Sequence, residues 1–101
     1  MLIVGGKTRY TARMKMRELE HIFKAFANVR RLSILSHLKH RKSATVGEIA
    51  GHIRLSFKST SKHLIILRSA GILKFDQSGL EMHYRISDEL AREARTLLSI
   101  A

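Results

Sequence analysis

The chain has 101 residues, with 19 lysine and arginine against 8 aspartate and glutamate side chains and a formal net charge of +11. Its length and its apolar content of 45% favour one folded domain with a modest core, and the absence of cysteine excludes disulfides, thiolate catalysis and cysteine-based zinc sites. The charge excess favours nucleic acid, an acidic partner or an anionic surface as the ligand, although an excess of this kind can also serve solubility alone.

The first predicted element is a basic N-terminal arm over residues 1–12, and residues 13–101 form a single predicted domain. A first helix is expected from about Arg13 to Ala27, because its apolar residues repeat at helical spacing. These residues are Leu19, Ile22, Phe23 and Phe26. The start MLIVGG is too short for a signal peptide and no stretch has transmembrane length, so we expect a cytoplasmic, nucleoid-associated protein without membrane contact.

The middle of the chain predicts three further helices, each with a capping residue. Asn28 is expected to begin a second helix that ends near His40, with Leu32, Leu35 and Leu38 facing the core. Thr45 and Glu48 form a predicted capping box for a short third helix. Its apolar stripe is Val46, Ile49, Ala50 and Ile53. Ser56 then begins a fourth helix that runs to Ala70, and Gly71 is expected to end it in the left-handed conformation.

Beyond Gly71 the apolar period changes from that of a helix to that of a strand. The segments ILKF, DQSG and LEMHYRI predict a strand, a tight turn at Gly79 and a second strand. A last helix follows, with Asp88 and Glu89 in its first turn. Its apolar stripe is Leu90, Ala94, Leu97 and Leu98. The predicted fold class is mainly α (α+β), in the order α-α-α-α-β-β-α, which is a winged helix-turn-helix.

The fourth helix, residues 56–70, has two faces of different character. Thr60, Leu64 and Leu67 group on a face that suits a core, whereas Lys58, Ser61, Lys62 and Ile65 group on the opposite face. The second face can enter a DNA major groove, where its lysines contact bases or phosphates, or it can be a solvated surface. Phe57 and Ile65 either contact thymine methyl groups or cover the edge of the core, and for Phe57 we expect packing.

The chain contains a series of short motifs: RLSIL at 31–35, VGEIA at 46–50, LS at 55–56, SKHL at 61–64, LRSAG at 67–71 and HYRIS at 83–87. With these motifs the segment from Asn28 to Leu73 resembles the ArsR/SmtB type of winged-helix transcriptional repressor. The resemblance, which covers roughly residues 18–98, implies an obligate-type symmetric dimer through the first and last helices. It also implies a pseudo-palindromic double-stranded DNA operator, with the fourth helix in the major groove.

The candidate site residues follow from the resemblance and the face analysis together. Those expected to contact DNA are Ser56, Phe57, Lys58, Ser59, Ser61, Lys62, His63 and Ile65, with Lys74 and Arg85 from the wing. Those expected at the dimer interface are Leu19, Ile22, Phe23, Phe26, Leu90, Ala94, Leu97 and Leu98. An acidic residue, Asp76, near the wing tip weakens the expected contribution of the wing to affinity.

The metal sites of the resembled family are not expected here. Thr45 and Gly47 stand where many members carry cysteines, and no histidine follows Arg85 to join Asp88 in a site on the last helix. His37 and His40 can share a helix face, but their charged neighbours are cations, which disfavour a divalent metal. We therefore expect no metal and no cofactor.

Three functions remain open from the sequence. The first is a metal-independent, dimeric, sequence-specific DNA-binding regulator, most simply a repressor. The second is a non-specific architectural DNA- or RNA-binding protein with the same fold, and the third is a module that docks an acidic protein. An enzyme is not expected, because no nucleophile has a nearby base and no glycine-rich phosphate loop follows a strand. The operator, the regulated gene and any effector are not encoded in recognisable motifs.

Overall fold

The computed structural model describes the backbone of residues 5–101 and the side chains of residues 16–101. Five helices and a small sheet follow one another along this part of the chain. They are α1 (Gly5–Phe26), α2 (Val29–Leu38), β1 (Ala44–Thr45), α3 (Val46–Ile53), α4 (Phe57–Ser69), β2 (Leu73–Ser78), β3 (Glu81–Ile86) and α5 (Arg92–Ile100). The predicted order of helices and hairpin is confirmed, with the short strand β1 as an addition.

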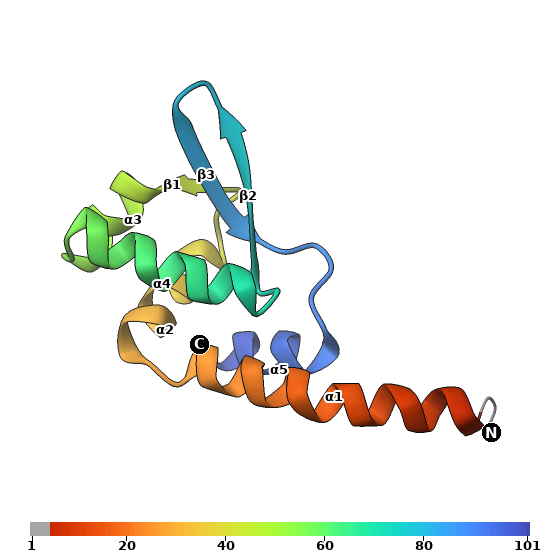
Figure 1. Ribbon diagram of the computed structural model, residues 1–101. Coiled ribbons are helices and arrows are strands. Elements are labelled where there is room, and N and C mark those ends of the chain that lie inside the picture. Colours follow the sequence, from red (N-terminus) through yellow and green to blue (C-terminus); the bar gives the residue numbers. More distant parts are fainter. Residues whose placement is uncertain (1–4) are drawn as a thin grey trace.

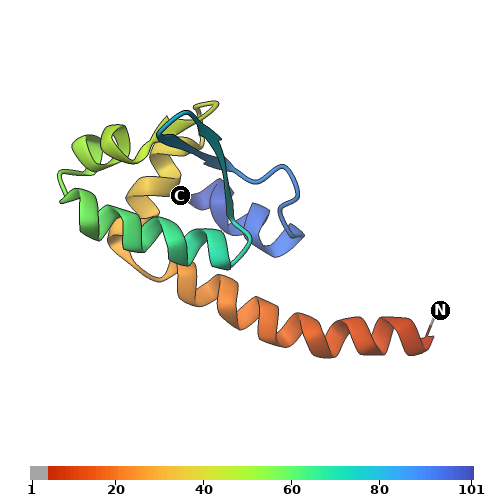
Figure 2. The ribbon, with the colours of Figure 1, turned by 45° about the horizontal axis from the view of Figure 1, so that its top comes forward.

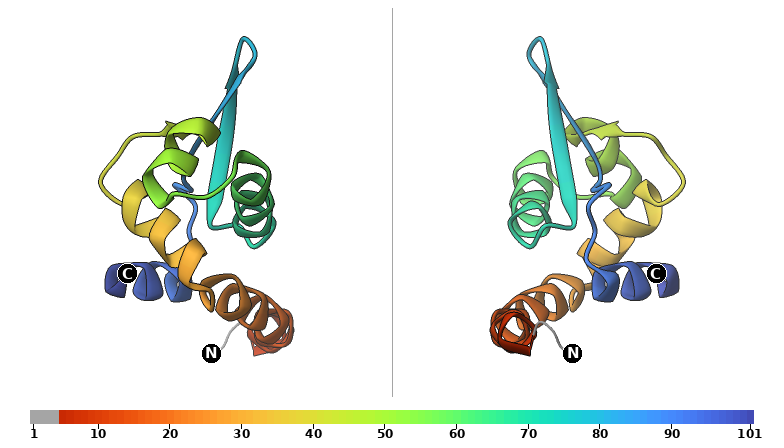
Figure 3. Two further views of the ribbon diagram at one scale, coloured as in Figure 1. Left: turned by 90° about the vertical axis from the view of Figure 1, so that its left-hand side faces the viewer. Right: turned by 90° about the vertical axis from the view of Figure 1, so that its right-hand side faces the viewer.

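The elements are arranged between two ends of the molecule. In Figure 1, α1 and α5 lie together at the bottom, α2, α3 and α4 form the middle, and the β2–β3 hairpin projects from the top as a wing. Figure 2 shows that the N-terminal half of α1 extends beyond the remaining helices. Figure 3 shows the wing rising on the side opposite α1. The hairpin and the exposed side of α4 therefore belong to an end of the molecule that α1 and α5 do not cover.

The sheet is antiparallel with the strand order β1-β3-β2. Its inner strand β3 pairs Tyr84 with both Ala44 and Phe75. Gly79 has a φ of 63° in the hairpin turn, a conformation that suits glycine, as predicted. One hydrophobic core contains Tyr84 and Leu73 of the sheet together with residues of α1, α2, α3, α4 and α5. Its fully buried members include Ile34, Leu35, Leu38, Ile49, Leu64, Leu67 and Ile72.

Two expectations were wrong, one about a helix face and one about where the last helix begins. Leu32 is exposed, and Ile34 takes the core position beside Leu35 and Leu38. Asp88 and Glu89 are not in the first turn of the last helix, because α5 begins only at Arg92 after Ala91. Both carboxylates instead form ion pairs with Lys74 of β2. Asp88 and Glu89 thus pair with a cation of the wing strand and do not lie in the first turn of the following helix.

The first helix is longer than expected, since α1 begins at Gly5 and not near Arg13. Apart from the start of α5, the other helix ends agree with the predictions within two residues. Residues 1–4, and the side chains before Met16 on which the predicted arm depends, lie outside the described residues. The division of the chain into an arm over 1–12 and a domain over 13–101 stays a prediction.

Candidate nucleic-acid interface

The helix-turn-helix unit is built by local hydrogen bonds that the sequence predicts. The Thr45 backbone N–H donates to Glu48 Oε1 (2.8 Å) and the Glu48 backbone N–H donates to Thr45 Oγ1 (3.2 Å), which completes the capping box of α3. These bonds hold the pKa of Glu48 below its usual value. Arg54 ends α3 with a φ of 55°, a left-handed conformation in a non-glycine residue. This turn sets the direction in which α4 leaves α3.

The fourth helix is fixed at both ends and along one face. The Ser56 hydroxyl accepts from the Ser59 backbone N–H at 3.1 Å, and Gly71 ends the helix with a φ of 76°, as predicted. Thr60, Leu64 and Leu67 are fully buried, as the face analysis predicts. Because the Ser56 hydroxyl serves as the helix cap, its predicted role in DNA contact competes with a structural one.

Lys58 and Lys62 lie on the exposed side of α4 in its first two turns. Within the described part of the chain, neither lysine forms a hydrogen bond or an ion pair with another side chain. Ser59 and Ser61 beside them are partly exposed. Two unneutralised cations with hydroxyls between them form a surface that can bind an anionic ligand.

Two large apolar side chains share the exposed side of α4. Phe57 is 62% exposed and Ile65 is 50% exposed, so the expectation that Phe57 packs at the edge of the core was wrong. Phe57 lies in the first turn of α4, where Thr60 is the buried residue. Both residues are therefore available to a ligand.

The two cations expected from the wing are already paired. Lys74 Nζ lies 3.1 Å from Asp88 Oδ1 and also contacts Glu89 Oε1, which raises the pKa of Lys74 and lowers that of Asp88. Arg85 Nε donates to Asp76 Oδ2 at 3.0 Å. Contact of Lys74 or Arg85 with phosphate would have to replace these bonds. Their assignment to DNA contact stays a prediction, and the structure lends it little support.

A pair of consecutive arginines at the start of α2 was missed as a structural feature. Arg30 Nη1 donates to the Ile53 carbonyl at the end of α3 (3.1 Å). Arg31 donates through Nε to the Ala25 carbonyl (2.6 Å) and through Nη2 to the Lys24 carbonyl (3.0 Å), both in the last turn of α1. These carbonyls have no partner within their helices. Two of the basic side chains in the N-terminal half thus donate hydrogen bonds to carbonyls at the ends of α1 and α3.

Arg31 also contacts α4. Its Nη1 lies 3.2 Å from Nδ1 of His63, on α4. Burial, and then the neighbouring Arg31 and Arg30, lower the pKa of His63, so its ring is neutral near pH 7 and Nδ1 accepts the bond. His63 is thereby a structural contact between α2 and α4, and its predicted contact with DNA has no exposed cationic ring to support it.

A groove of about 580 Å³ lies between α4 and the wing. It is lined on the helix side by Phe57, Ser61, Ile65 and Arg68, on the wing side by Leu80, Glu81, Met82 and Tyr84, and at its floor by Thr45, Val46 and Gly47. Leu80, at the wing tip, is fully exposed. We call this feature the α4–wing groove. Sequence reasoning missed it, because its walls come together only through the fold.

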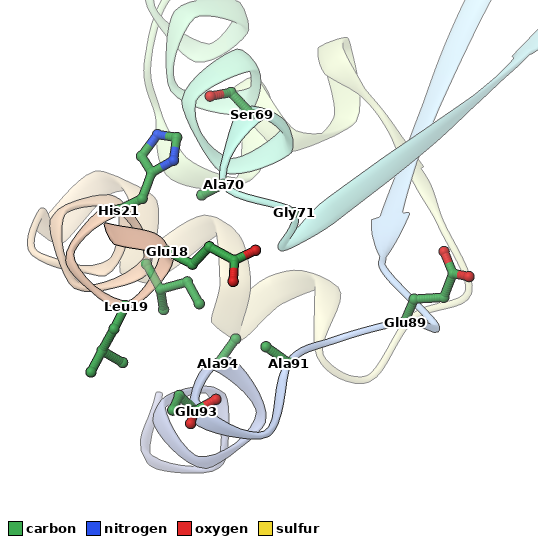
Figure 4. Close-up of a pocket in the computed structure, with 11 residues that line it drawn as sticks. Glu18, Leu19, His21, Ser69, Ala70, Gly71, Glu89, Ala91, Glu93 and Ala94 are labelled. Carbon is green, nitrogen blue, oxygen red and sulfur yellow. The ribbon is translucent and has the colours of Figure 1, made fainter. Parts of the chain in front are cut away.

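A smaller cavity of about 310 Å³ lies between α1, the end of α4 and the start of α5. In Figure 4 the side chain of Glu18 extends toward the gap between Gly71 and Ala91, with Glu93 below it and Glu89 at the far edge. Glu89 is already paired with Lys74. The cavity is acidic in a strongly basic chain, but its position away from the exposed side of α4 separates it from the DNA-facing surface.

The described residues form neither a metal site nor a membrane span. No group of three or more histidine, cysteine, aspartate or glutamate side chains within residues 16–101 is placed to hold a metal ion. His37 does not combine with His40; its ring stacks on that of His52, with centroids 3.9 Å apart. None of the helices among the described residues has both the length and the hydropathy that a membrane span requires.

Comparison with known proteins agrees with this architecture. Residues 28–74 match the family model described as bacterial regulatory protein, arsR family. The chain is 35% identical over 79 residues to an HTH-type transcriptional regulator of Methanocaldococcus jannaschii, covering 78% of this chain and 89% of that protein. It is 30% identical over 76 residues to the transcriptional repressor SdpR of Bacillus subtilis, covering 75% and 83%.

A solved structure gives the same result for the fold. A homodimeric winged helix-turn-helix DNA-binding domain from Mycobacterium bovis superposes with a TM-score of 0.76 at 26% identity, over 88% of this chain and 79% of that one. The family and the fold are those of DNA-binding regulators and not of enzymes, in agreement with the expectation from the sequence. The chain belongs to the arsR family of bacterial regulatory proteins, and it is a transcriptional regulator with a DNA-binding winged helix-turn-helix.

Proposed function

We propose that the protein is a dimeric, sequence-specific repressor that inserts α4 into the major groove of a pseudo-palindromic operator, independently of metal. The observation that carries this proposal is the exposed pair Lys58 and Lys62, free of ion pairs with other described side chains, on a helix whose opposite face is anchored in the core. Cations on the first turns of such a helix fix its register on DNA through phosphates, while neighbouring polar groups contact base edges.

Dimer formation is supported by apolar side chains that the single chain leaves exposed at the α1–α5 end. Met16 and Phe23 on α1 are 62% and 50% exposed, and Ile100 on α5 is 77% exposed. Four of the expected interface residues, however, are buried in the core of their own subunit. They are Ile22, Phe26, Ala94 and Leu98. The interface we propose therefore uses Phe23 and the partly exposed Leu19, Leu90 and Leu97, together with Met16 and Ile100. The similar domain from Mycobacterium bovis is homodimeric, which supports a dimer without defining its interface.

Repression and metal independence are supported by two further observations. The relative SdpR is a transcriptional repressor. The sequence has no cysteine, and Thr45 and Gly47 are used for capping and for a helix turn. The regulator would act in the cytoplasm at the nucleoid, where its DNA lies.

A second candidate function is favoured by the net charge of +11, which allows binding to any nucleic acid. A non-specific architectural DNA- or RNA-binding protein would use the same lysines for phosphate contact alone. The two functions differ in the ratio of affinities for a selected site and for a random duplex, which is typically 10³–10⁷ for specific regulators.

The experiment is a binding-site selection with the purified protein, followed by fluorescence anisotropy on the selected and the scrambled duplex across a range of salt. We expect the double variant Lys58→Ala/Lys62→Ala to bind more weakly and to reduce the slope of log affinity against log salt by about one for each lost phosphate contact. The control is Arg95→Ala, which removes one positive charge from α5 at the end of the molecule opposite the wing, whereas the double variant removes two from α4 (Figure 1). Equal loss in the control and the double variant, or equal affinity for both duplexes, would contradict the proposal.

A further inference from the structure

The α4–wing groove has an unusual composition for a surface that faces DNA. Its helix side includes Phe57 and Ile65 beside Ser61 and Arg68, and the fully exposed Leu80 stands at the wing tip opposite. Soluble domains seldom expose neighbouring large apolar side chains unless a ligand or partner covers them. The free protein therefore bears an apolar surface that its own fold does not use.

The position of this surface next to the lysines indicates which ligand can cover it. Phe57, Ser61 and Ile65 follow one another every fourth residue and form one line along α4. Lys58 and Lys62 each lie one residue further, about 100° around the helix. Because Phe57, Ser61 and Ile65 line the groove together with wing residues, the apolar line lies on the side of α4 that faces the wing, next to the lysines. A duplex held by the two lysines meets the apolar line directly.

A DNA duplex offers few groups that match such a line. Phosphates suit the apolar line itself poorly, because Phe57 and Ile65 provide no counter-charge. Of the nearby cations, Arg68 lies over the ring of Phe75 and Arg85 is engaged by Asp76. In the major groove, the apolar group on the base edges is the C5 methyl of thymine. The chemistry of the groove therefore matches thymine methyl groups better than any other part of DNA.

We propose that Phe57 and Ile65 contact thymine methyl groups, so that affinity for the operator depends on thymine at the positions facing the α4–wing groove. This inference rests on the proposed function. Phe57 and Ile65 are eight positions apart, which is about 12 Å along the helix. Successive base pairs are about 3.4 Å apart, so the two side chains contact methyl groups of different base pairs.

The test compares two duplexes of the selected site, one with thymine and one with uracil at every thymine position. The two bases differ only in the C5 methyl group. We expect the wild-type protein to bind the uracil duplex about fourfold more weakly for each contacted methyl, the effect of removing one buried methyl group. The double variant Phe57→Ser/Ile65→Ser is expected to bind both duplexes equally.

The matched control is Ile66→Ser, because Ile66 is also an exposed isoleucine of α4 but does not line the groove. It should keep the full preference for thymine. The ratio of two affinities for one protein sample does not depend on the folded fraction, so a variant of lower stability still gives an interpretable result. Equal wild-type binding to both duplexes, or a thymine preference retained in the double variant, would overturn the proposal. The proposed function is tested separately by the affinity for the selected thymine duplex relative to a scrambled thymine duplex. That comparison can show sequence specificity even if thymine and uracil duplexes bind equally.

Discussion

Arg31 is expected to contribute more to stability than a partly exposed arginine normally does. Its guanidinium joins three helices, since it bonds carbonyls of the last turn of α1 and His63 of α4 from a position in α2. Replacing it with methionine keeps the apolar stem but removes every one of these bonds. The carbonyl of Ala25 and the ring nitrogen of His63 would then lose their partner in a partly buried place.

The size of the effect follows from the two part-buried bonds. A hydrogen bond to a charged group contributes about 1.5–3 kcal/mol, and using the lower value for each gives a loss of about 3 kcal/mol. The bond to the Lys24 carbonyl is exposed and adds little. A domain of this size has a total stability of about 5–15 kcal/mol, and 1 kcal/mol shifts its melting temperature by about 4–8 °C. We therefore expect Arg31→Met to melt about 12–24 °C lower.

The assay is urea denaturation followed by circular dichroism, with the melting temperature as a second measurement. Arg95→Met is the matched control, because Arg95 is an exposed arginine of α5 whose side chain has no hydrogen-bond or ion-pair partner among the described residues. It should change the free energy of unfolding by no more than about 0.5 kcal/mol. If Arg31→Met lost less than 1 kcal/mol, or no more than the control, the role of Arg31 in joining the helices would be refuted.

Two further predictions concern pH and a buried hydroxyl. The pKa values of His37 and His63 lie below 6.5, mainly because of burial, so the unfolded chain binds more protons than the native protein as pH falls below 6.5. The free energy of unfolding should therefore fall as the pH is lowered from 6.5 to the native pKa values of these histidines. In urea denaturation at several pH values, the double variant His37→Gln/His63→Gln should show a smaller change of this free energy with pH. An unchanged pH dependence would count against burial of the two histidines as its cause. Thr60 Oγ1 is buried without a hydrogen-bond partner among the described residues, so Thr60→Val should leave stability unchanged or raise it by up to about 1 kcal/mol in the same denaturation assay. A loss of more than 1 kcal/mol would show that the hydroxyl has a stabilising role.

The parts of the fold that depend on neighbouring residues could be predicted from the sequence. The capping box of Thr45 and Glu48 and the caps at Asn28 and Ser56 form between residues two or three apart, so their pattern is visible in the chain. Gly71 and Gly79 mark positive φ angles for the same reason. These local signals were sufficient to place the helix-turn-helix and the wing.

What the sequence could not provide depends on contacts between distant residues. Leu32 and Ile34 are both apolar and two positions apart in α2, and only the packing against the other helices shows which of them is buried. Lys74 resembles a free wing cation until the fold brings Asp88 and Glu89 beside it. The exposure of Phe57 and Ile65 follows likewise from where the wing projects, so the α4–wing groove had no signal in the chain.

The most direct test of the central claim is a hydroxyl-radical footprint of the purified protein on its selected duplex at moderate salt. A dimer that inserts one α4 from each subunit should protect two half-sites whose centres lie about one helical turn, or 34–36 Å, apart. The Lys58→Ala/Lys62→Ala variant should lose both protected regions together at the same protein concentration. Uniform protection along the duplex, or a single protected region without a symmetric partner, would contradict the account of a dimeric, sequence-specific regulator.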